Sequence, residues 1–254
     1  MKRIALGTFF FLLFQLLSGQ PALSQNLIPP NKIYHDGLNE ISVYDDLGMT
    51  IVSVHDGFEF LFVPDDVDAL ESIARAKHYR FVINGSYFDN SALHAGHSGW
   101  LRIYGKTYSP LRPDVQLTHV ARFDSASMKT SFINMDGFAP GTDDHSIEFQ
   151  TCPLIIDSNK VALSLIQHSV NGSGRYKRTL MAVTDNSVVY LITVKNRVSL
   201  DSLANYLLSL SIFASHRLDV VNLDGGSSVA LYVQHHPELN YNESARLPML
   251  IGVK

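Results

Sequence analysis

Residues 218–228 read LDVVNLDGGSS, an apolar run typical of a buried strand that ends in a carboxylate, two glycines and two serines. Glycines after a strand let the backbone turn sharply and point successive N–H groups at an anion. The stretch therefore predicts an anion-binding turn made of Asp224, Gly225, Gly226, Ser227 and Ser228. A purely structural turn, capped by Asp and Ser, explains the local composition equally well. The stretch matches neither the Walker loop nor the dinucleotide-binding fingerprint, so nucleotide binding is not supported.

A second strand with a similar ending lies earlier in the chain. Residues 79–83 form an apolar run that leads into Asn84, Gly85 and Ser86. If both strands lie in one sheet with their carboxyl ends on the same side, the two polar turns meet at the edge where open α/β sheets bind ligands. We therefore expect Asn84 and Gly85 to lie beside Asp224.

Two helices and a series of strands are expected around these turns. Asp65 and Ser199 are candidate N-caps of amphipathic helices, because apolar residues recur at helical spacing after each of them. The region 90–145 is rich in Gly, Ser, His and Pro, which is typical of long loops, and it contains short strand-like pieces at residues 100–104, 117–123 and 130–134. Strands are expected at residues 41–44, 49–54, 58–63, 79–83, 154–157, 178–184, 188–194 and 218–223. The predicted fold class is α+β: a single domain with a mixed β-sheet core, two main amphipathic helices and long decorating loops.

Composition limits the classes of partner. The 254 residues are 46% hydrophobic and 17% charged, which indicates a globular protein with ample material for a core. Twenty Lys and Arg stand against twenty-four Asp and Glu, for a formal net charge of −4. Because nucleic-acid binding relies on a surplus of cations that neutralise phosphates, nucleic acid is not an expected partner.

Residues 1–24 are expected to form a secretory signal peptide. A basic pair precedes an apolar run over residues 7–17, and Ala22 and Ser24 fit the small-residue pattern before a cleavage site. The run is shorter than the roughly 20 residues of a membrane span, and no later stretch approaches that length. The sequence thus predicts a mature domain over 25–254 without a transmembrane anchor, periplasmic or secreted. The lack of paired cysteines favours a bacterial periplasm.

Arg178 is a candidate phosphate ligand. It opens a predicted strand beside Arg175 and Lys177. A guanidinium group can hold a phosphate through two parallel hydrogen bonds. A surface cation near a loop is the alternative interpretation.

The other chemistry-bearing residues give weaker signals. The sequence has eleven histidines but neither a His-Glu-x-x-His motif nor a paired Cys motif. The sequence therefore requires no cofactor, and binding of a divalent metal stays an open alternative. His94 and His97 are candidate ligands or acid–base groups, with solvated loop histidines as the alternative. Asp89 and Asp185 are further carboxylates that hydrolase chemistry could use. Cys152 lies in an apolar run and is expected to be buried rather than reactive.

Five segments together resemble the phosphodiester glycosidase family, which includes many exported bacterial proteins. They are residues 83–88, 150–155, 178–179, 200–210 and 222–228. The last is the most specific, and the resemblance covers most of the mature chain. The chain departs from the family pattern at Ser86, Cys152 and Ser227, where the family commonly has Gly or another small residue.

The resemblance implies a hydrolase that cleaves the glycosidic bond of a sugar-1-phosphodiester or phosphorylated glycan, releasing sugar and leaving a phosphomonoester. It implies that Asp224 is base, nucleophile or electrostatic partner of the sugar cation. Arg178, the glycine amides and the two serines would hold the phosphate, and Asn84 would orient sugar hydroxyls or phosphate. Two alternatives stay open: an envelope protein that binds anionic or phosphorylated polysaccharide without cleaving it, and P–O cleavage by a metal held by Asp224, Asp89 and a loop histidine.

Overall fold

The computed structural model describes residues 27–55, 57–62, 70–89, 96–113, 116–163, 173–243 and 247–254. The predicted signal peptide, the helix N-cap at Asp65 and the candidate ligand His94 lie outside the described residues. Within them, no helix is long and apolar enough to cross a membrane.

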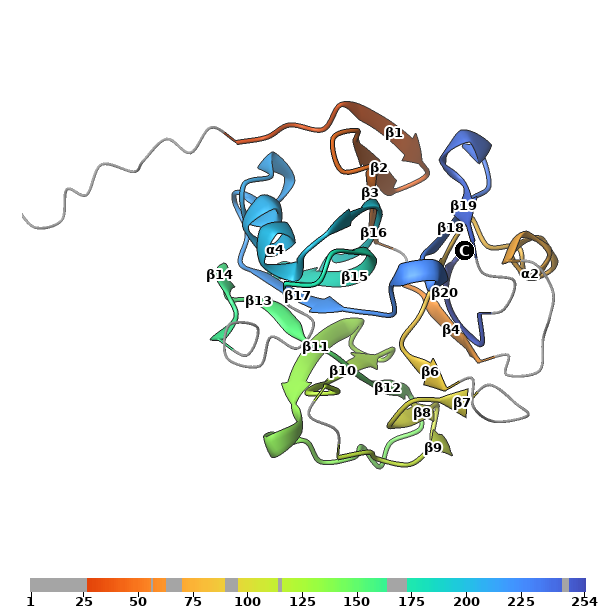
Figure 1. The fold of residues 1–254 in the computed structure, drawn as a ribbon. Helices are drawn as coiled ribbons and strands as arrows, with labels where there is room; N and C mark the ends of the chain where they lie inside the picture. The colour runs from red at the N-terminus through yellow and green to blue at the C-terminus, as the bar shows by residue number, and fades with distance from the viewer. Residues whose placement is uncertain are drawn as a thin grey trace, which may run out of the picture.

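The largest sheet has eight strands and carries the 218–228 segment (Figure 1). Its strands, in spatial order, are β1 (Lys32–Asp36), β2 (Asn39–Tyr44), β3 (Met49–Val54), β16 (Val189–Val198), β15 (Tyr176–Thr184), β17 (Leu218–Asn222), β13 (Leu154–Asp157) and β14 (Lys160–Val161). Helix α4 (Leu200–Leu208) covers one face of this sheet through Leu200, Leu203 and Leu207, which pack against the sheet's apolar residues. The hydroxyl of Ser199 accepts a hydrogen bond from the Ser202 amide, which confirms the predicted N-cap.

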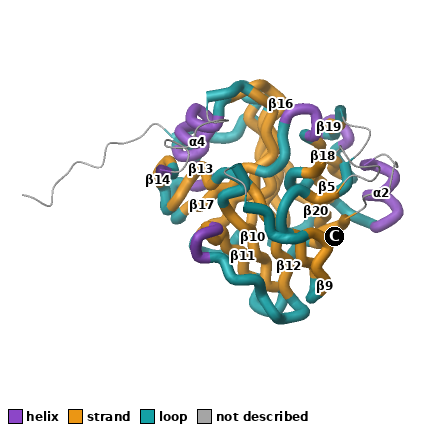
Figure 2. Tube along the Cα trace, turned by 60° about the horizontal axis from the view of Figure 1, so that its bottom comes forward, coloured by secondary structure: helices purple, strands orange, loops and turns teal. Residues whose placement is uncertain are grey.

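A second sheet of five strands carries the Asn84 turn. Its spatial order is β19 (Tyr241–Asn242), β18 (Ala230–Val233), β5 (Phe81–Asn84), β20 (Met249–Val253) and β4 (Glu59–Phe62). Helix α2 (Leu70–Lys77) packs on it through Leu70, Ile73 and Ala74. Figures 1 and 2 show α2 and α4 on opposite sides of the molecule, each on its own sheet.

The region 90–145, expected to form long loops with short strand-like pieces, contributes most of a third sheet, and the pieces expected at 100–104, 117–123 and 130–134 correspond to β8, β10 and β11. Its strands, in spatial order, are β11 (Lys129–Asn134), β10 (His119–Asp124), β12 (Ser146–Thr151), β8 (Leu101–Ile103) and β9 (Lys106–Ser109). A small hairpin, β6 (Phe88–Asp89) and β7 (Gly96–His97), precedes it. Short 3-10 helices complete the chain: η1 (Met135–Gly137), η2 (Ser211–Phe213), η3 (Gly226–Ser228) and η4 (Pro237–Leu239).

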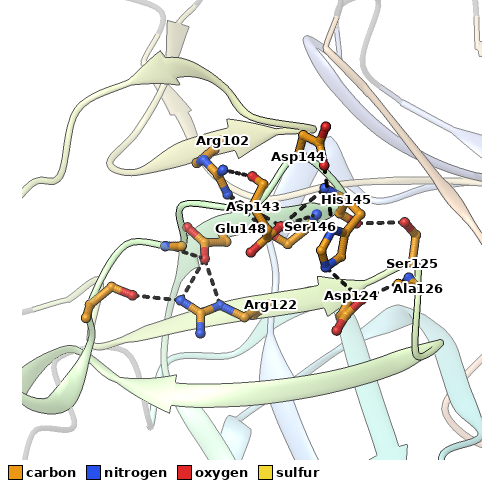
Figure 3. Close-up of polar contacts among 12 residues, drawn as sticks. Arg102, Arg122, Asp124, Ser125, Ala126, Asp143, Asp144, His145, Ser146 and Glu148 are labelled. Carbon is orange, nitrogen blue, oxygen red and sulfur yellow. Dashed lines mark hydrogen bonds and ion pairs between the residues drawn. The ribbon is translucent and has the colours of Figure 1, made fainter.

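One face of the third sheet carries a network of polar side chains (Figure 3). Glu148, fully buried, accepts hydrogen bonds from Arg122 Nε at 2.7 Å and the Gly141 amide at 3.0 Å, and its second oxygen accepts from the indole of Trp100 at 2.9 Å. Alternate residues such as Phe123 face the core. Buried ionic groups need such complete bonding, and the partners of Glu148 come from segments up to 48 residues away in the sequence.

Every strand pair within these sheets of the described chain is antiparallel, whereas a mixed sheet was expected. Short connections such as residues 185–188 between β15 and β16 join antiparallel neighbours directly. One apolar core lies among the three large sheets. It includes Ile41, Met181 and Val221 of the first, Ile83 and Ile251 of the second, and Phe123 and Phe149 of the third. The fold thus brings the ends of β5 and β17 together from two different sheets.

Candidate active site

The two polar turns predicted to meet do lie side by side. The side-chain amide of Asn84 donates to the Asp224 carbonyl at 2.8 Å, and the Asp224 amide donates to the Gly85 carbonyl at 3.2 Å. The expected single sheet was wrong, because β5 and β17 belong to different sheets. The site therefore lies at a junction of sheets rather than along one sheet edge.

Asn84 is a buried cross-link at this junction, only 2% exposed. Its Oδ1 accepts hydrogen bonds from Thr179 Oγ1 at 2.6 Å and from the Ala230 amide at 3.1 Å. With the bond to the Asp224 carbonyl, the amide connects β5, β15, β18 and the 222–228 turn. This bonding makes Asn84 a positioning residue for the turn.

Gly85 packs against Met249 of β20 at the same junction. A Cβ on Gly85 would come within 2.6 Å of Met249 Cγ and 3.2 Å of the Met249 carbonyl oxygen. Its amide donates to that carbonyl at 2.8 Å. Gly85 therefore permits the close approach of two backbone segments. It is buried and so offers no exposed surface to a ligand.

Asp224 is the carboxylate that the fold places at the junction. Its Oδ1 accepts from the Gly225 amide at 2.9 Å, and the Ser228 hydroxyl also hydrogen-bonds to it. Burial raises the pKa of Asp224 to about 6, even though both hydrogen bonds favour the ionised form. A carboxyl group that titrates near neutrality inside a polar turn is typical of an acid–base or nucleophilic residue.

The two glycines of the turn serve different purposes. A Cβ on Gly225 would lie 2.6 Å from the Lys177 carbonyl oxygen, so only glycine lets the turn pack against β15. Gly226 has a φ of +66° with open space around its Cα, so it supplies the left-handed turn. Because the Gly225 amide already donates to Asp224, the turn offers fewer free donors to an anion than the sequence suggested. Ser227 is exposed, whereas Ser228 is buried against the carboxylate.

Arg178 lies beneath the surface beside this turn, only 4% exposed. Its guanidinium donates to the Gly174 carbonyl at 2.7 Å and to the Val198 carbonyl at 3.4 Å, and it lies 5.2 Å from the centre of the Tyr176 ring. Burial lowers its pKa, while nearby Tyr87, Tyr176 and Cys152 act in the opposite direction. The guanidinium keeps its charge because an arginine stays protonated in proteins. It places a buried positive charge beside the site.

Tyr87 is a site residue that the sequence did not indicate. Its hydroxyl donates to the Cys152 carbonyl at 3.2 Å and accepts from the side-chain amide of Asn222. Burial raises its pKa well above 10; the charge of Asp224 raises it further and that of Arg178 lowers it. Tyr87 therefore remains a neutral hydroxyl between the carboxylate and the guanidinium. The only local signal was a tyrosine three residues after Asn84, which has no chemical signature by itself.

Asn222 is the second residue that sequence reasoning missed. Besides Tyr87, its side-chain amide donates to the Leu223 carbonyl at 2.8 Å. Its Oδ1 is buried and has no hydrogen-bond partner among the residues that the structure describes. Asn222, the last residue of β17, thus holds the Tyr87 hydroxyl in place two residues before Asp224.

The remaining candidates lie apart from this cluster. Asp185 is exposed in the β15–β16 turn, at the opposite end of β15 from Arg178, and its carboxylate contacts His216 at 3.2 Å. His97 is buried and its Nδ1 donates to the Gly99 carbonyl at 3.1 Å; burial lowers its pKa to about 4, so the ring is neutral. Asp89 is exposed at the end of β6. Cys152 is buried, as expected.

No three His, Cys, Asp or Glu side chains of the described residues are grouped so that they could hold a metal ion. Asp224, Asp89 and His97 therefore do not form the metal site of the P–O cleavage alternative. The other histidine of that alternative, His94, lies outside the described residues. The chemistry that this geometry offers is that of one perturbed carboxylate, one buried cation and a polar turn.

Comparison with known proteins places this site in a family. A family model described as phosphodiester glycosidase matches residues 77–254. The chain belongs to the phosphodiester glycosidase family. The match includes both turns of the junction, Arg178 and α4, which agrees with the resemblance seen in the sequence. No curated protein matches this member of the family.

Solved structures share the fold of this family member at low sequence identity. The catalytic domain of zebrafish N-acetylglucosamine-1-phosphodiester alpha-N-acetylglucosaminidase, auto-inhibited by its pro-peptide, has a TM-score of 0.60 and 15% identity, covering 87% of this chain and 80% of that one. A hypothetical protein from Synechocystis has a TM-score of 0.57 and 15% identity, covering 87% of this chain and 60% of that one. A protein from Burkholderia pseudomallei whose name suggests export has a TM-score of 0.56 and 8% identity, covering 81% and 74%. The chain thus spans less than two thirds of the Synechocystis protein.

Proposed function

We propose that this phosphodiester glycosidase hydrolyses the glycosidic bond of a sugar-1-phosphodiester, releasing the sugar and leaving a phosphomonoester. The observation that carries the proposal is the Asp224 carboxyl group, whose pKa is raised to about 6 at the junction of the two turns. Family membership and the structural likeness to a sugar-phosphodiester glycosidase support the same chemistry.

The expected reaction breaks the bond between the anomeric carbon and the phosphate oxygen. A phosphate leaves far more readily than an alkoxide, so the reaction needs little help from a general acid. The transition state separates a positively charged sugar from a negatively charged phosphate, and both charges need stabilisation. The ionised Asp224 faces the positively charged sugar as base, nucleophile or electrostatic partner. The positive charge of Arg178 and the exposed Ser227 hydroxyl stabilise the negatively charged phosphate.

The proposal includes export. Residues 1–24 have the charge and apolar pattern of a signal peptide. A similarly folded protein from Burkholderia pseudomallei has a name that suggests export. We therefore propose that the enzyme meets a phosphorylated glycan in the periplasm or outside the cell.

The proposal is tested by incubating residues 25–254 with a panel of sugar-1-phosphodiesters, with gluco and galacto rings, each plain and N-acetylated. We expect release of reducing sugar from at least one substrate, with solvent oxygen-18 appearing in the sugar. Label in the phosphate would instead indicate P–O cleavage. Saturable binding without any release across the panel would favour the non-catalytic glycan-binding alternative. Addition of a chelator to the same assays measures any metal dependence.

Tyr176 is expected to contribute to substrate binding. Its ring is 48% exposed, lies against Gly174, and has the Arg178 guanidinium 5.2 Å from its centre. An exposed aromatic face beside such a site is suited to stacking on a sugar ring. We expect Tyr176→Ala to raise KM about tenfold with little change in kcat, and Tyr176→Phe to resemble the wild type.

The matched control for this prediction is Tyr108→Ala, which removes a tyrosine of similar exposure, 42%, from β9 of the third sheet. Steady-state kinetics on the best substrate of the panel measure all three variants. A fall in kcat with unchanged KM in Tyr176→Ala, or a Phe variant as impaired as the Ala variant, would contradict a stacking role.

A further inference from the structure

A cluster of cations, the basic rim, lies beside the candidate active site. It consists of Arg175 and Lys177 at the start of β15 and Lys195 and Arg197 at the end of β16. The pairing of these strands shifts here: Tyr176 is opposite Val198, whereas Arg178 is opposite Val194. The extra residues on β16 therefore bulge out opposite Lys177. The Arg175 guanidinium donates to the Arg197 carbonyl at 3.2 Å, which ties the two outer cations together.

Tyr241 holds the two lysines of the basic rim in place. The ammonium groups of Lys177 and Lys195 lie 5.1 Å and 5.2 Å from the centre of its ring. Lys177 also bonds the Tyr241 hydroxyl and the Glu243 carboxylate, and Lys195 donates to the Leu239 carbonyl at 3.3 Å. Two like charges gathered on one aromatic ring repel each other, so the arrangement favours a bound anion.

Acidic residues do not neutralise the basic rim. Glu243 pairs with Lys177, and Arg197 lies close enough to help lower the pKa of Glu243. Within the described chain, no carboxylate comes within 4.0 Å of Arg175, Lys195 or Arg197. The Asp46 side chain, on the neighbouring turn, is bound by the Tyr206 hydroxyl at 2.7 Å. Four cations thus stand against two carboxylates, those of Glu243 and Asp46, on a chain of net charge −4.

The basic rim adjoins the 224–228 turn through the backbone. The Lys177 carbonyl packs directly on Gly225, and Arg178 is the next residue of β15. On the other side, Asn242 pairs with Ala230, two residues after Ser228. The basic rim is therefore close enough to the turn to contact a substrate that extends beyond it on this side.

We propose that the basic rim binds a second phosphate of the substrate, one that is not cleaved, so that the natural substrate is a polyanionic glycan with repeated phosphodiesters. This inference rests on the proposed function and names its substrate class. Binding of successive phosphates would hold the substrate across the site, and the attraction between the cations and the phosphates is strongest at low salt.

The test compares two substrates that share one scissile linkage: a monomeric sugar-1-phosphodiester and an oligomer of several sugar-1-phosphate repeats. The enzymes are the wild type, the double variant Arg175→Gln/Arg197→Gln, and the control Lys32→Gln/Lys129→Gln, which removes the same charge from exposed positions on β1 and β11. We expect the rim variant to raise KM for the oligomer at low salt by about tenfold or more and to leave KM and kcat for the monomer unchanged. High salt should abolish the difference, and the control variant should behave as the wild type.

Other outcomes separate this inference from the proposed function. Turnover of the monomer with equal KM values for the oligomer in all three enzymes overturns the rim inference and leaves the function standing. Absence of turnover with both substrates refutes the proposed function. In that case, calorimetry measures the Kd of the oligomer for the three enzymes and tests the rim inference separately. Equal Kd values for the three enzymes overturn the rim inference. Rim-dependent binding to anionic phospholipid vesicles, with no rim effect on the oligomer, would assign the rim to a membrane and overturn the inference.

Discussion

Replacing Asp224 with asparagine is expected to lower kcat/KM on a sugar-1-phosphodiester by about a thousandfold or more while the protein stays folded. Asparagine keeps the size of the side chain and an oxygen that accepts from the Gly225 amide. It removes the negative charge that we propose stabilises the sugar cation. Steady-state kinetics and circular dichroism on the same preparation measure both effects. Asp185→Asn is the matched control, because it removes an exposed carboxylate far from the site and should leave kcat/KM unchanged. Normal activity of Asp224→Asn, or its failure to fold, would contradict the assigned role.

The raised pKa of Asp224 also fixes the direction of the pH dependence. All three assigned roles use the ionised carboxylate, so kcat should rise with pH and level off above about 6. The rise should disappear in the residual activity of Asp224→Asn. A kcat that instead falls as the pH rises through 6 would show that the protonated acid is the working form.

The same shift has a consequence for stability. The folded-state pKa of about 6 lies above the ordinary value of 3.8, so protonation favours the folded state. That stabilisation is fully present below about pH 4 and is lost as the pH rises through about 6. Asparagine resembles the protonated acid, so Asp224→Asn should equal the wild type near pH 4 and exceed it at pH 8 by on the order of 1–3 kcal/mol. Urea unfolding at the two pH values measures the difference.

Asn84→Ala is expected to reduce the free energy of unfolding by about 3–5 kcal/mol. The change leaves the Thr179 hydroxyl, the Ala230 amide and the Asp224 carbonyl without their buried partner. Urea unfolding compares it with Asn205→Ala, which removes an exposed asparagine bonded to the Asp201 carbonyl of its own helix and should cost less than about 0.5 kcal/mol.

The outcome for Asn84→Ala also distinguishes two roles. If the amide positions the 222–228 turn, stability and activity fall together. A variant of wild-type stability that has lost activity would instead support the role implied by the family resemblance, in which Asn84 contacts the substrate directly.

Local patterns predicted the parts of the fold that depend on neighbouring residues. The α4 helix begins after Ser199 as expected, because both the cap and the apolar spacing are local. The two glycine turns were found for the same reason, and their convergence followed from their similar endings. The strand-like pieces at 100–104, 117–123 and 130–134 were predicted from the same local patterns and correspond to β8, β10 and β11. Their pairing into a separate third sheet was not predicted, because it depends on contacts such as the bond between Arg122 and Glu148 that join distant residues.

The sequence singled out the charged residues at the junction and several neutral ones, but not Tyr87 and Asn222. Asp224 and Arg178 have chemical signatures that a sequence displays. Tyr87 and Asn222 acquire their roles only through a contact between residues 135 positions apart. Asn84 was selected correctly for its position beside Asp224, whereas its bonds to Thr179 and Ala230 required the folded chain.

The burial of Asn84 bears on the choice of host for producing this protein. Asn84-Gly85-Ser86 is an acceptor pattern for N-linked glycosylation, and a eukaryotic secretory pathway attaches glycans to such sites on exposed chain. A glycan on Asn84 could not be accommodated, because the side-chain nitrogen lies in the interior and donates to the Asp224 carbonyl. Removing the pattern at Ser86 would sacrifice its buried hydrogen bond to the Gln150 carbonyl at 2.8 Å. A host that lacks this modification leaves both residues free to fold.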